Sequence, residues 1–410
     1  MSKRILARAA AVLVLAGAAA GCHDSDAIVL GPKATGANAI FQSYVSIGNS
    51  IAAGYQSDGI NDNTQRQSFP SLLAQQMRTR FAYPSLALPG CPPPITNFQT
   101  GARLGGASAP PCALRNAASA TDILNNVAVP GAETFDATMP VGPKANVLTQ
   151  LVLGGKTQAQ RAIEARPTFV SIELGPNNAL GAALSGLLTP TPGVTTGLTP
   201  ETSFESSYAA LTTQLTDALP TLQGVIVNVP DVTAIPALVP GPVFANPAAG
   251  AALNAATGKT VTVLPNCATS ASLISLNIIT AIKSGQHPTT ISCDKAPDPN
   301  YPLLGDIFVL DATEQAAVSG AVAGYNTFLK AKADSLGFAY YDLKSALSAL
   351  RGTADVKAIV DFTSATNPCG LALSLDCVHP TAHGNALIAN GIIAAINAKY
   401  QTTLALVAVP

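Results

Sequence analysis

Short hydrophobic runs alternate with longer segments in which hydrophobic residues recur at helical spacing. The runs at residues 44–47, 168–174, 224–228 and 338–341 are typical of buried strands. The helical segments lie between or after them, at residues 69–77, 157–166, 204–219, 311–335 and 382–399. Such an alternation predicts βαβ units, and therefore an α/β fold in which helices cover both faces of a doubly wound parallel sheet.

Two long stretches interrupt this alternation, at residues 86–120 and 239–302. The first is rich in Pro and Gly, and each contains two cysteines. Long connections of this kind are more often functional loops than plain linkers. We expect both to be cysteine-stapled insertions that shape the mouth of a site, with surface decoration as the alternative.

The N-terminus has the pattern of an export signal. Lys3, Arg4 and Arg8 are followed by an apolar stretch at residues 9–20, which is too short to span a bilayer comfortably. The sequence Ala-Ala-Gly-Cys at residues 19–22 resembles the cleavage box of bacterial lipoproteins, which implies that Cys22 is acylated. We therefore expect a signal peptide at residues 1–21 and a tether at residues 22–39. The main domain is expected at residues 40–405.

This resemblance also implies a location. His23 follows the cysteine, where Asp would favour retention in the inner membrane, so the expected place is the outer membrane, held by a lipid anchor. Secretion without a lipid is the alternative. Oligomeric state has no signature in the sequence.

Seven cysteines are present, and six remain when Cys22 is set aside. They fall into three pairs that are local in sequence, which indicates an oxidising compartment. The predicted disulfides are Cys91–Cys112, Cys267–Cys293 and Cys369–Cys377. No CxxC occurs, and the four histidines do not cluster with these thiols, so no metal or other cofactor is expected.

Charge argues against nucleic acid as a partner. The expected mature chain has lost three of its 22 basic residues and none of its 23 acidic ones, which leaves 19 positive side chains against 23 negative. The chain also lacks Trp. A carbohydrate-binding surface of stacked aromatic rings is therefore disfavoured.

Ser50 and His379 are the strongest candidates for chemistry. Ser50 directly follows the first predicted strand, at the start of a helix, where free N–H groups favour negative charge. A helix-capping role is the alternative. Near the other end, Asp376 precedes His379 by three residues, a spacing that lets the carboxylate orient the imidazole. Serine needs such an oriented base to become a nucleophile.

Four blocks resemble those of the SGNH/GDSL hydrolase family, in the family's order. They are Gly-Asn-Ser at residues 48–50, Asn-Val-Ala-Val-Pro-Gly-Ala at residues 126–132, Gly-Pro-Asn-Asn at residues 175–178 and Asp-Cys-Val-His at residues 376–379. Asn49 and Asn178 stand where the family has Asp. The resemblance covers roughly residues 40–400 and implies a three-layer αβα sandwich with a flavodoxin-like sheet.

The resemblance also implies roles. Ser50 is the expected nucleophile, His379 the acid and base, and Asp376 the group that orients His379. The backbone N–H groups of Ser50 and Gly131 and the side-chain amide of Asn177 are expected to form the oxyanion hole. The expected activity is hydrolysis of carboxylic esters of small molecules or lipids, as an esterase or lipase. A carbohydrate O-acetyl esterase and a non-catalytic binding lipoprotein are the alternatives.

Two further motifs have less specific interpretations. His383 lies four residues after His379, but no HExxH pattern is present, so a structural place at the start of the last helix is expected. The acidic loop at residues 58–63 lacks the closing Glu of an EF-hand. A solvated turn is expected there rather than a calcium site.

Overall fold

A parallel sheet forms the centre of the molecule in this computed structural model, which describes residues 27–28, 36–106, 115–116, 122–139, 146, 148–191, 195–295 and 306–410. Within these residues the sheet has four strands in the order β11 (Ala339–Tyr341), β5 (Gln223–Val227), β4 (Phe169–Glu173) and β2 (Tyr44–Gly48). Every residue of β2 and β4 is buried, as expected for parallel strands covered on both faces.

One additional residue extends the sheet beyond β2. Asn126 makes a parallel bridge to Ser46, and the Val127 amide donates to the Ser46 carbonyl at 2.9 Å. With the segment around Asn126 taken as the second strand in chain order, the spatial order becomes 2-1-3-4-5. This is the flavodoxin-like order, in which the chain reverses direction across the sheet between the first and third strands. In this chain, β2 and β4 flank that reversal.

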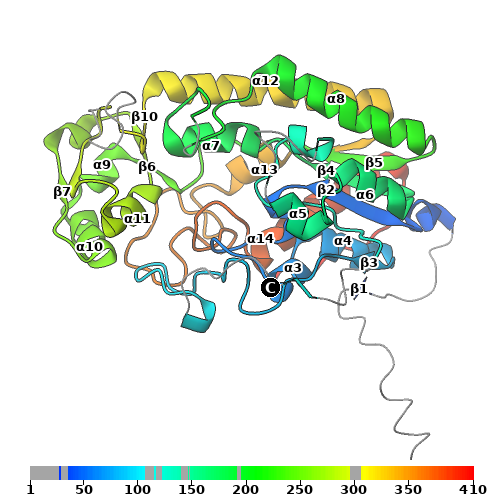
Figure 1. Ribbon diagram of the computed structural model, residues 1–410, viewed down its shortest axis with the longest axis horizontal. Helices are drawn as coiled ribbons and strands as arrows, with labels where there is room; N and C mark the ends of the chain where they lie inside the picture. Colours follow the sequence, from blue (N-terminus) through cyan, green and yellow to red (C-terminus); the bar gives the residue numbers. More distant parts are fainter. Residues whose placement is uncertain are drawn as a thin grey trace, which may run out of the picture.

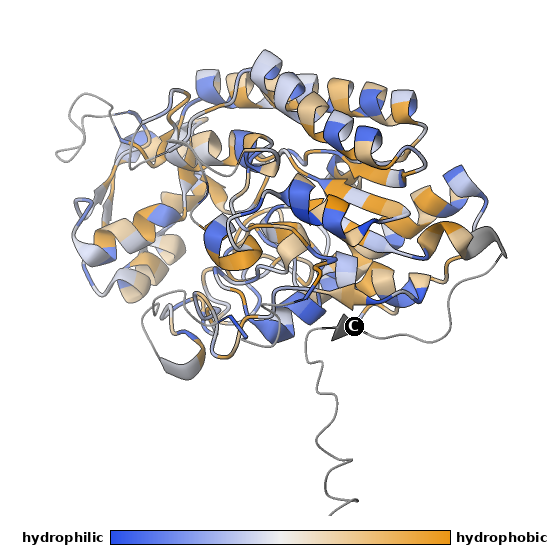
Figure 2. Cartoon of the chain, turned by 45° about the vertical axis from the view of Figure 1, so that its right-hand side comes forward, coloured by the Kyte–Doolittle hydropathy of each residue, from blue (hydrophilic) through white to orange (hydrophobic). Residues whose placement is uncertain are grey.

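Helices cover both faces of the sheet (Figure 1). One layer consists of α6 (Gln158–Ala165), α8 (Glu201–Ala218) and α12 (Ala312–Leu336), which share a hydrophobic core with Val45 and Ile172. On the other face, α4 (Phe69–Met77) and α14 (Ala382–Tyr400) pack in a second core. Hydrophobic residues gather in the strands between the two layers (Figure 2). The predicted three-layer αβα fold is confirmed.

The predicted and observed elements agree closely at their ends. The structure places α4 at the predicted residues, and β2, β4, β5, β11, α6, α12 and α14 within two residues of their predicted bounds. The sequence patterns did not identify the short helices α5 (Leu148–Leu153) and α13 (Leu343–Leu350). Near the N-terminus, β1 (Ala27–Ile28) pairs with β3 (Phe81–Ala82), and the 3-10 helix η1 spans Gly36–Phe41. β1 and the first residues of η1 precede Ile40, where the main domain was expected to begin.

Residues 239–295 fold into a small unit at one end of the sheet, at the left of Figure 1. It contains α9 (Gly241–Phe244), α10 (Pro247–Thr257), β7 (Thr262–Val263), η5 (Pro265–Thr269), α11 (Asn277–Ser284) and β9 (Thr290–Ile291). A short antiparallel sheet of β6 (Leu238–Pro240), β8 (Leu273–Ser275) and β10 (Val309–Leu310) joins the unit to the main body. Cys267 and Cys293 form the predicted disulfide within it.

The remaining described elements are short and lie near the carboxyl ends of the strands or at the rim. They are α2 (Ser50–Ala53), α3 (Asp62–Arg66), η2 (Leu104–Gly106), η4 (Phe135–Ala137) and α7 (Asn177–Ser185). No helix among the described residues combines the length and the apolar character that a bilayer crossing requires.

The packing of α14 against β11 gives a test of this architecture. A Cβ atom added at Gly391 of α14 would lie 2.3 Å from the ring of Tyr341, whereas nothing lies within 4 Å of one added at Gly320 of α12. We expect Gly391→Ala to lower the free energy of unfolding by about 1–3 kcal/mol through overpacking. Gly320→Ala should raise it by up to about 1 kcal/mol, because alanine is the better helix former.

Urea denaturation followed by circular dichroism measures both variants. If Gly391→Ala were as stable as Gly320→Ala, the close packing of α14 on β11 would be wrong.

Candidate functional site

Ser50 lies at the carboxyl end of β2, as the first residue of the short helix α2. Asn49 is the N-cap of this helix, and its side-chain oxygen accepts a hydrogen bond from the Ile51 amide at 3.0 Å. The alternative role considered for Ser50, that of helix cap, is therefore taken by its neighbour. The Ser50 side chain remains for another partner, although the residue is only 7 % exposed.

That partner is His379, which lies on the loop that precedes α14. The Ser50 Oγ and the His379 Nε2 are 2.8 Å apart, although the two residues are 329 positions apart in the chain. The other ring nitrogen, Nδ1, lies 2.9 Å from the Asp376 Oδ2. The structure thus brings the three predicted residues into one hydrogen-bonded series.

Asp376 is held by several donors. Its Oδ1 accepts hydrogen bonds from the backbone amides of His379 and Val378 at 2.8 and 2.9 Å, and its Oδ2 accepts one from the Asp58 amide at 2.7 Å. Burial raises the pKa of Asp376, but the positive charge of His379 and the hydrogen bonds outweigh burial and lower the pKa to about 2. The carboxylate is therefore ionised at neutral pH. An ionised Asp376 favours a proton on Nδ1 and leaves Nε2 to accept one from Ser50.

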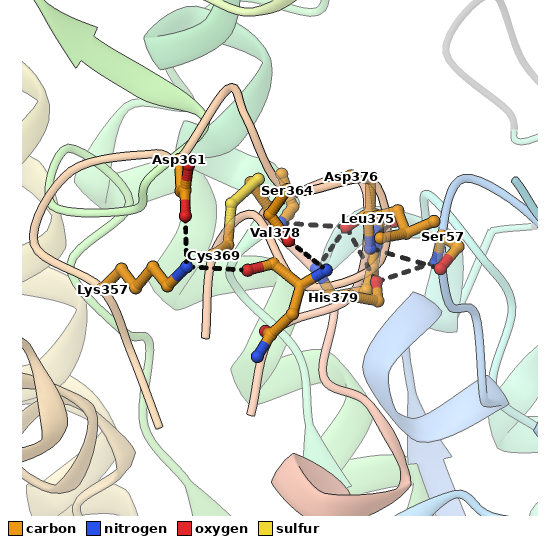
Figure 3. Close-up of a disulfide and its surroundings, with 12 residues drawn as sticks. Ser57, Lys357, Asp361, Ser364, Cys369, Leu375, Asp376, Val378 and His379 are labelled. Carbon is orange, nitrogen blue, oxygen red and sulfur yellow. Dashed lines mark hydrogen bonds and ion pairs between the residues drawn. A yellow bond between two sulfur atoms is a disulfide. The ribbon is translucent and has the colours of Figure 1, made fainter. Parts of the chain in front are cut away.

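The loop that carries Asp376 and His379 is cross-linked to its neighbourhood (Figure 3). Cys377 forms the predicted disulfide with Cys369. On the other side of the loop, the Leu375 amide donates to the Ser57 Oγ at 3.2 Å, and the Ser57 amide donates to the Ser374 Oγ at 2.8 Å. These bonds fix the position of His379 relative to the segment that follows Ser50.

Two side chains that the sequence patterns did not single out, Tyr55 and Arg103, support this geometry together with Asp58 of the acidic loop. The ring of Tyr55 packs against the His379 imidazole, with 4.8 Å between ring centroids. The Tyr55 hydroxyl donates to the Asp58 carboxylate at 3.1 Å, and Arg103 pairs with that same carboxylate. Asp58 therefore belongs to the support of Asp376, although it lies in a turn, as expected, and its side chain is 49 % exposed.

A buried carboxyl lies close to Asn49, the neighbour of Ser50. Glu173, at the end of β4, is 1 % exposed and accepts a hydrogen bond from the Asn49 Nδ2 at 3.1 Å. Burial raises the pKa of Glu173 to about 8, against the lowering effect of donors from Asn49 and Ala52. Because the folded state keeps this proton between about pH 4.5 and pH 8 while the unfolded chain loses it, this group's contribution to stability falls as pH rises through that range.

The other two expected oxyanion-hole residues are Asn177 and Gly131. Asn177 begins α7 after β4 and lines the same pocket as Ser50. One hydrogen of its side-chain amide is donated to the Ala132 carbonyl at 3.0 Å, which leaves the second hydrogen of that amide. Gly131 has a φ of 78°, and the nearby Val129 amide is bonded to the Gly48 carbonyl at 3.1 Å. A left-handed turn that suits glycine therefore lies beside the end of β2.

Asn178 does not face this pocket as its neighbour does. It is fully buried, and its side chain donates to the hydroxyls of Thr134 and Thr199, both at 3.1 Å. The neutral side chain of Asn178 therefore links the segment at residues 131–139, through Thr134, to the start of α8, through Thr199.

An apolar pocket opens beside Ser50, Asn177 and His379. The space between its walls, counting space open to solvent, is about 800 Å³. Its walls come from α13, α14, α7 and the segment after β5. The side chains that form them include Leu180, Val232, Ile235, Leu347, Leu350 and Leu387.

The other predicted residues have separate places. His383 is in the first turn of α14, where its ring bonds to Asp355 at 2.9 Å, away from Ser50. Asn61 caps α3. Among the residues that the structure describes, no three His, Cys, Asp or Glu side chains are placed to hold a metal ion. Cys22 and Cys112 lie outside the described residues, so the predicted lipidation and the Cys91–Cys112 pair are not described.

Comparisons with known proteins bear on this arrangement. The family model described as GDSL-like Lipase/Acylhydrolase matches residues 44–392. A search of curated proteins finds no match. Similar solved structures include a putative GDSL-like lipase from Parabacteroides merdae, with 11 % identity, 89 % of this chain and 98 % of that chain covered, and a TM-score of 0.36. Phospholipase A1 from Streptomyces albidoflavus has 13 % identity, coverage of 88 % and 99 %, and a TM-score of 0.36.

A family two carbohydrate esterase with a carbohydrate-binding domain, from Corynascus thermopiles, has 15 % identity, coverage of 75 % and 68 %, and a TM-score of 0.27. These scores are too low to support any argument about substrate. The family model, by contrast, spans most of the chain and includes β2, β4, Ser50 and His379. The chain belongs to the GDSL-like lipase/acylhydrolase family.

Proposed function

We propose that this protein hydrolyses carboxylic esters through an acyl-enzyme intermediate, with Ser50 as nucleophile. The observation that carries the proposal is the hydrogen-bonded series from Ser50 through His379 to Asp376, with distances of 2.8 and 2.9 Å. The family supports an ester hydrolase in general. The roles of the individual residues are our assignment.

In this mechanism the Ser50 Oγ attacks the ester carbonyl while the His379 Nε2 takes its proton. The ionised Asp376 stabilises the imidazolium that forms. The tetrahedral intermediate then collapses, the ester C–O bond breaks, and His379 gives the proton to the departing alcohol. Water enters, His379 removes its proton, and a second attack releases the acid and restores Ser50.

The negative oxygen of each tetrahedral intermediate needs hydrogen-bond donors. The N–H groups of Ser50 and Gly131 and the second hydrogen of the Asn177 amide would supply them. In such sites the loss of one donor typically costs about 3–4 kcal/mol of transition-state stabilisation. The bond from Asn177 to the Ala132 carbonyl holds the amide in place before substrate arrives.

The apolar pocket favours an aliphatic acyl group over acetate. Leu180, Ile235 and Leu347 line it beside Ser50, and burial of each methylene there would contribute about 0.8 kcal/mol. A carbohydrate O-acetyl esterase, the nearest alternative, would gain nothing from these walls. We therefore favour an esterase or lipase for medium or long acyl chains.

We also propose that the protein is exported and anchored by lipid at Cys22, in the outer membrane if it is retained on the cell. This proposal is supported by the N-terminus, where basic residues are followed by an apolar stretch, and by the small residues before Cys22. The Cys267–Cys293 and Cys369–Cys377 disulfides suit an oxidising compartment.

Ser50→Ala should abolish turnover of p-nitrophenyl butyrate, because no other group replaces the Oγ. We expect a fall of at least about 10³-fold in kcat, measured by nitrophenolate release. A fluorophosphonate should label the wild-type chain at Ser50 and leave the variant unlabelled. A wild-type chain that takes up no label would favour a binding protein on a hydrolase scaffold instead.

Leu347→Trp should narrow the acyl pocket. We expect kcat/KM for p-nitrophenyl octanoate to fall about tenfold or more, while the value for p-nitrophenyl acetate changes little. Ala349→Trp is the matched control, since this exposed residue of α13 does not line the pocket. Equal losses for octanoate and acetate in the Leu347 variant would contradict the assignment of this pocket to the acyl chain.

Cys22→Ser should release the protein from membranes. In cells that express the full chain, we expect the wild type in the detergent-soluble membrane fraction and labelled by an alkynyl fatty acid. The variant should incorporate no label. If the wild-type chain took up no alkynyl fatty acid, the lipid anchor would be excluded. Secretion of the protein without a lipid would then be the remaining alternative.

A further inference from the structure

A second, larger cleft reaches the catalytic histidine from the other side. It encloses about 1590 Å³, counting space open to solvent, which is twice the volume of the apolar pocket. His379, Val378 and Leu180 line both hollows, so the residue proposed as the base borders each of them. Asp376 lines only the cleft, whereas Ser50 and Asn177 line only the pocket.

Part of the wall of this cleft comes from the two segments that interrupt the α/β alternation, and most of the rest comes from α7, Phe308 and the loop at residues 375–379. Phe98, Gln99 and Thr100 belong to the first segment, and Ile279, Thr280 and Lys283 belong to α11 in the second. At the rim the Lys283 Nζ donates to the Thr100 carbonyl at 3.1 Å, so the two segments contact one another. In Figure 1 the small unit with α11 and the loop of the first segment lie on the same side of the molecule.

The chemistry of ester cleavage assigns the two hollows to different parts of the substrate. His379 must deliver its proton to the leaving alcohol oxygen, so the alcohol departs on the side of the imidazole. The carbonyl oxygen must face Asn177 and the Ser50 amide, which places the acyl carbon above Ser50. The acyl chain then continues into the pocket that Ser50 and Asn177 line, and the alcohol lies in the cleft that His379 and Asp376 line.

We propose that the cleft between the two inserted segments binds the alcohol part of the ester, and that this part is bulky, uncharged and largely apolar. This inference rests on the proposed acyl-enzyme mechanism. The lining is mainly aliphatic and aromatic, with neutral polar groups such as Thr280 at its edge.

The charged side chains on this lining are already engaged within the protein. Asp58 pairs with Arg103, Asp376 pairs with His379, and Lys283 bonds to the Thr100 carbonyl. With its carboxylates paired and its remaining cation bonded to the protein, such a lining favours apolar surface and shape. The described walls are also braced before substrate arrives, by the Cys267–Cys293 disulfide and by the contact at Lys283.

The chain has no tryptophan, so a single introduced indole reports on its own surroundings. Thr280→Trp places this probe on the cleft, at an exposed residue of α11. Ser284→Trp is the matched control, on the same helix and exposed, but not on the lining. Both are made in the Ser50→Ala background, where no ester is consumed.

We expect 1-octanol to shift the emission of the Thr280→Trp protein to shorter wavelength in a saturable manner. Methanol at equal concentration should not do so, and the Ser284→Trp protein should respond to neither. The Leu347→Trp protein, with its probe in the acyl pocket, should respond to octanoate. If 1-octanol shifts the Leu347→Trp protein and leaves the Thr280→Trp protein unchanged, the assignment of the cleft is overturned.

Kinetics give the second readout. With Ser50 present, octyl hexanoate and methyl hexanoate form the same hexanoyl-enzyme, so their kcat/KM values differ only through the alcohol. Release of hexanoic acid is followed by titration. We expect the wild type to prefer the octyl ester, and Thr280→Trp to lower kcat/KM for it about tenfold while methyl hexanoate changes by less than about twofold.

If the wild type had equal kcat/KM values for the two esters, the assignment of the cleft to the alcohol would be refuted. The proposed hydrolase activity would still stand. A wild type that cleaves neither ester and takes up no fluorophosphonate would refute the hydrolase itself. The octanol titration in the Ser50→Ala background would still show whether the cleft binds an apolar alcohol.

Discussion

The carboxylate of Asp376 determines the geometry of the site. It accepts hydrogen bonds from two amides of its own loop, from the His379 ring and from the Asp58 amide. The first two set the shape of the loop, the third orients the imidazole, and the fourth attaches the loop to the segment that follows Ser50. Without this carboxylate, the His379 imidazole would have no fixed orientation. The loop before α14 would also lose a direct hydrogen bond to the segment that follows Ser50.

The sheet provides the crevice at which the loop with Asp376 and His379 meets Ser50. β2 and β4 are neighbours, but the chain leaves them in opposite directions across the sheet, so their carboxyl ends border an open crevice. Ser50 follows one strand and Asn177 follows the other. The loop before α14 then brings His379 over this crevice, where α13 and α14 add apolar walls.

The sequence alone predicted most of the central fold, because parallel strands covered on both faces are recognisable as continuous hydrophobic runs. β2 and β4 are examples. The edge position at Asn126 was not recognised as part of the sheet, since it contributes one bridge and two adjacent asparagines interrupt the apolar residues around it. Helix α13 was missed because it spans only Leu343–Leu350, and in so short an apolar segment periodicity alone does not distinguish a helix from a strand.

For the site, local motifs led to Ser50, Asp376 and His379, which the structure joins. The supporting residues could not be found in this way. Arg103 reaches Asp58 across 45 positions, and Asp58 reaches Asp376 across 318, so neither contact has a local pattern. Glu173 did offer a signal, since a carboxyl within a buried apolar strand needs a partner or a raised pKa, and it has both.

The separation of 329 residues between Ser50 and His379 has a consequence for the chain during synthesis. A growing polypeptide carries Ser50, the proposed nucleophile, almost from the start, but His379, the proposed base, is made near the end. Until the loop with His379 is made and α14 has packed against β11, the proposed mechanism has no group to take the proton of the serine. On that mechanism, partly made or truncated chains would be silent towards esters, and hydrolysis would begin only once this last part of the domain is in place.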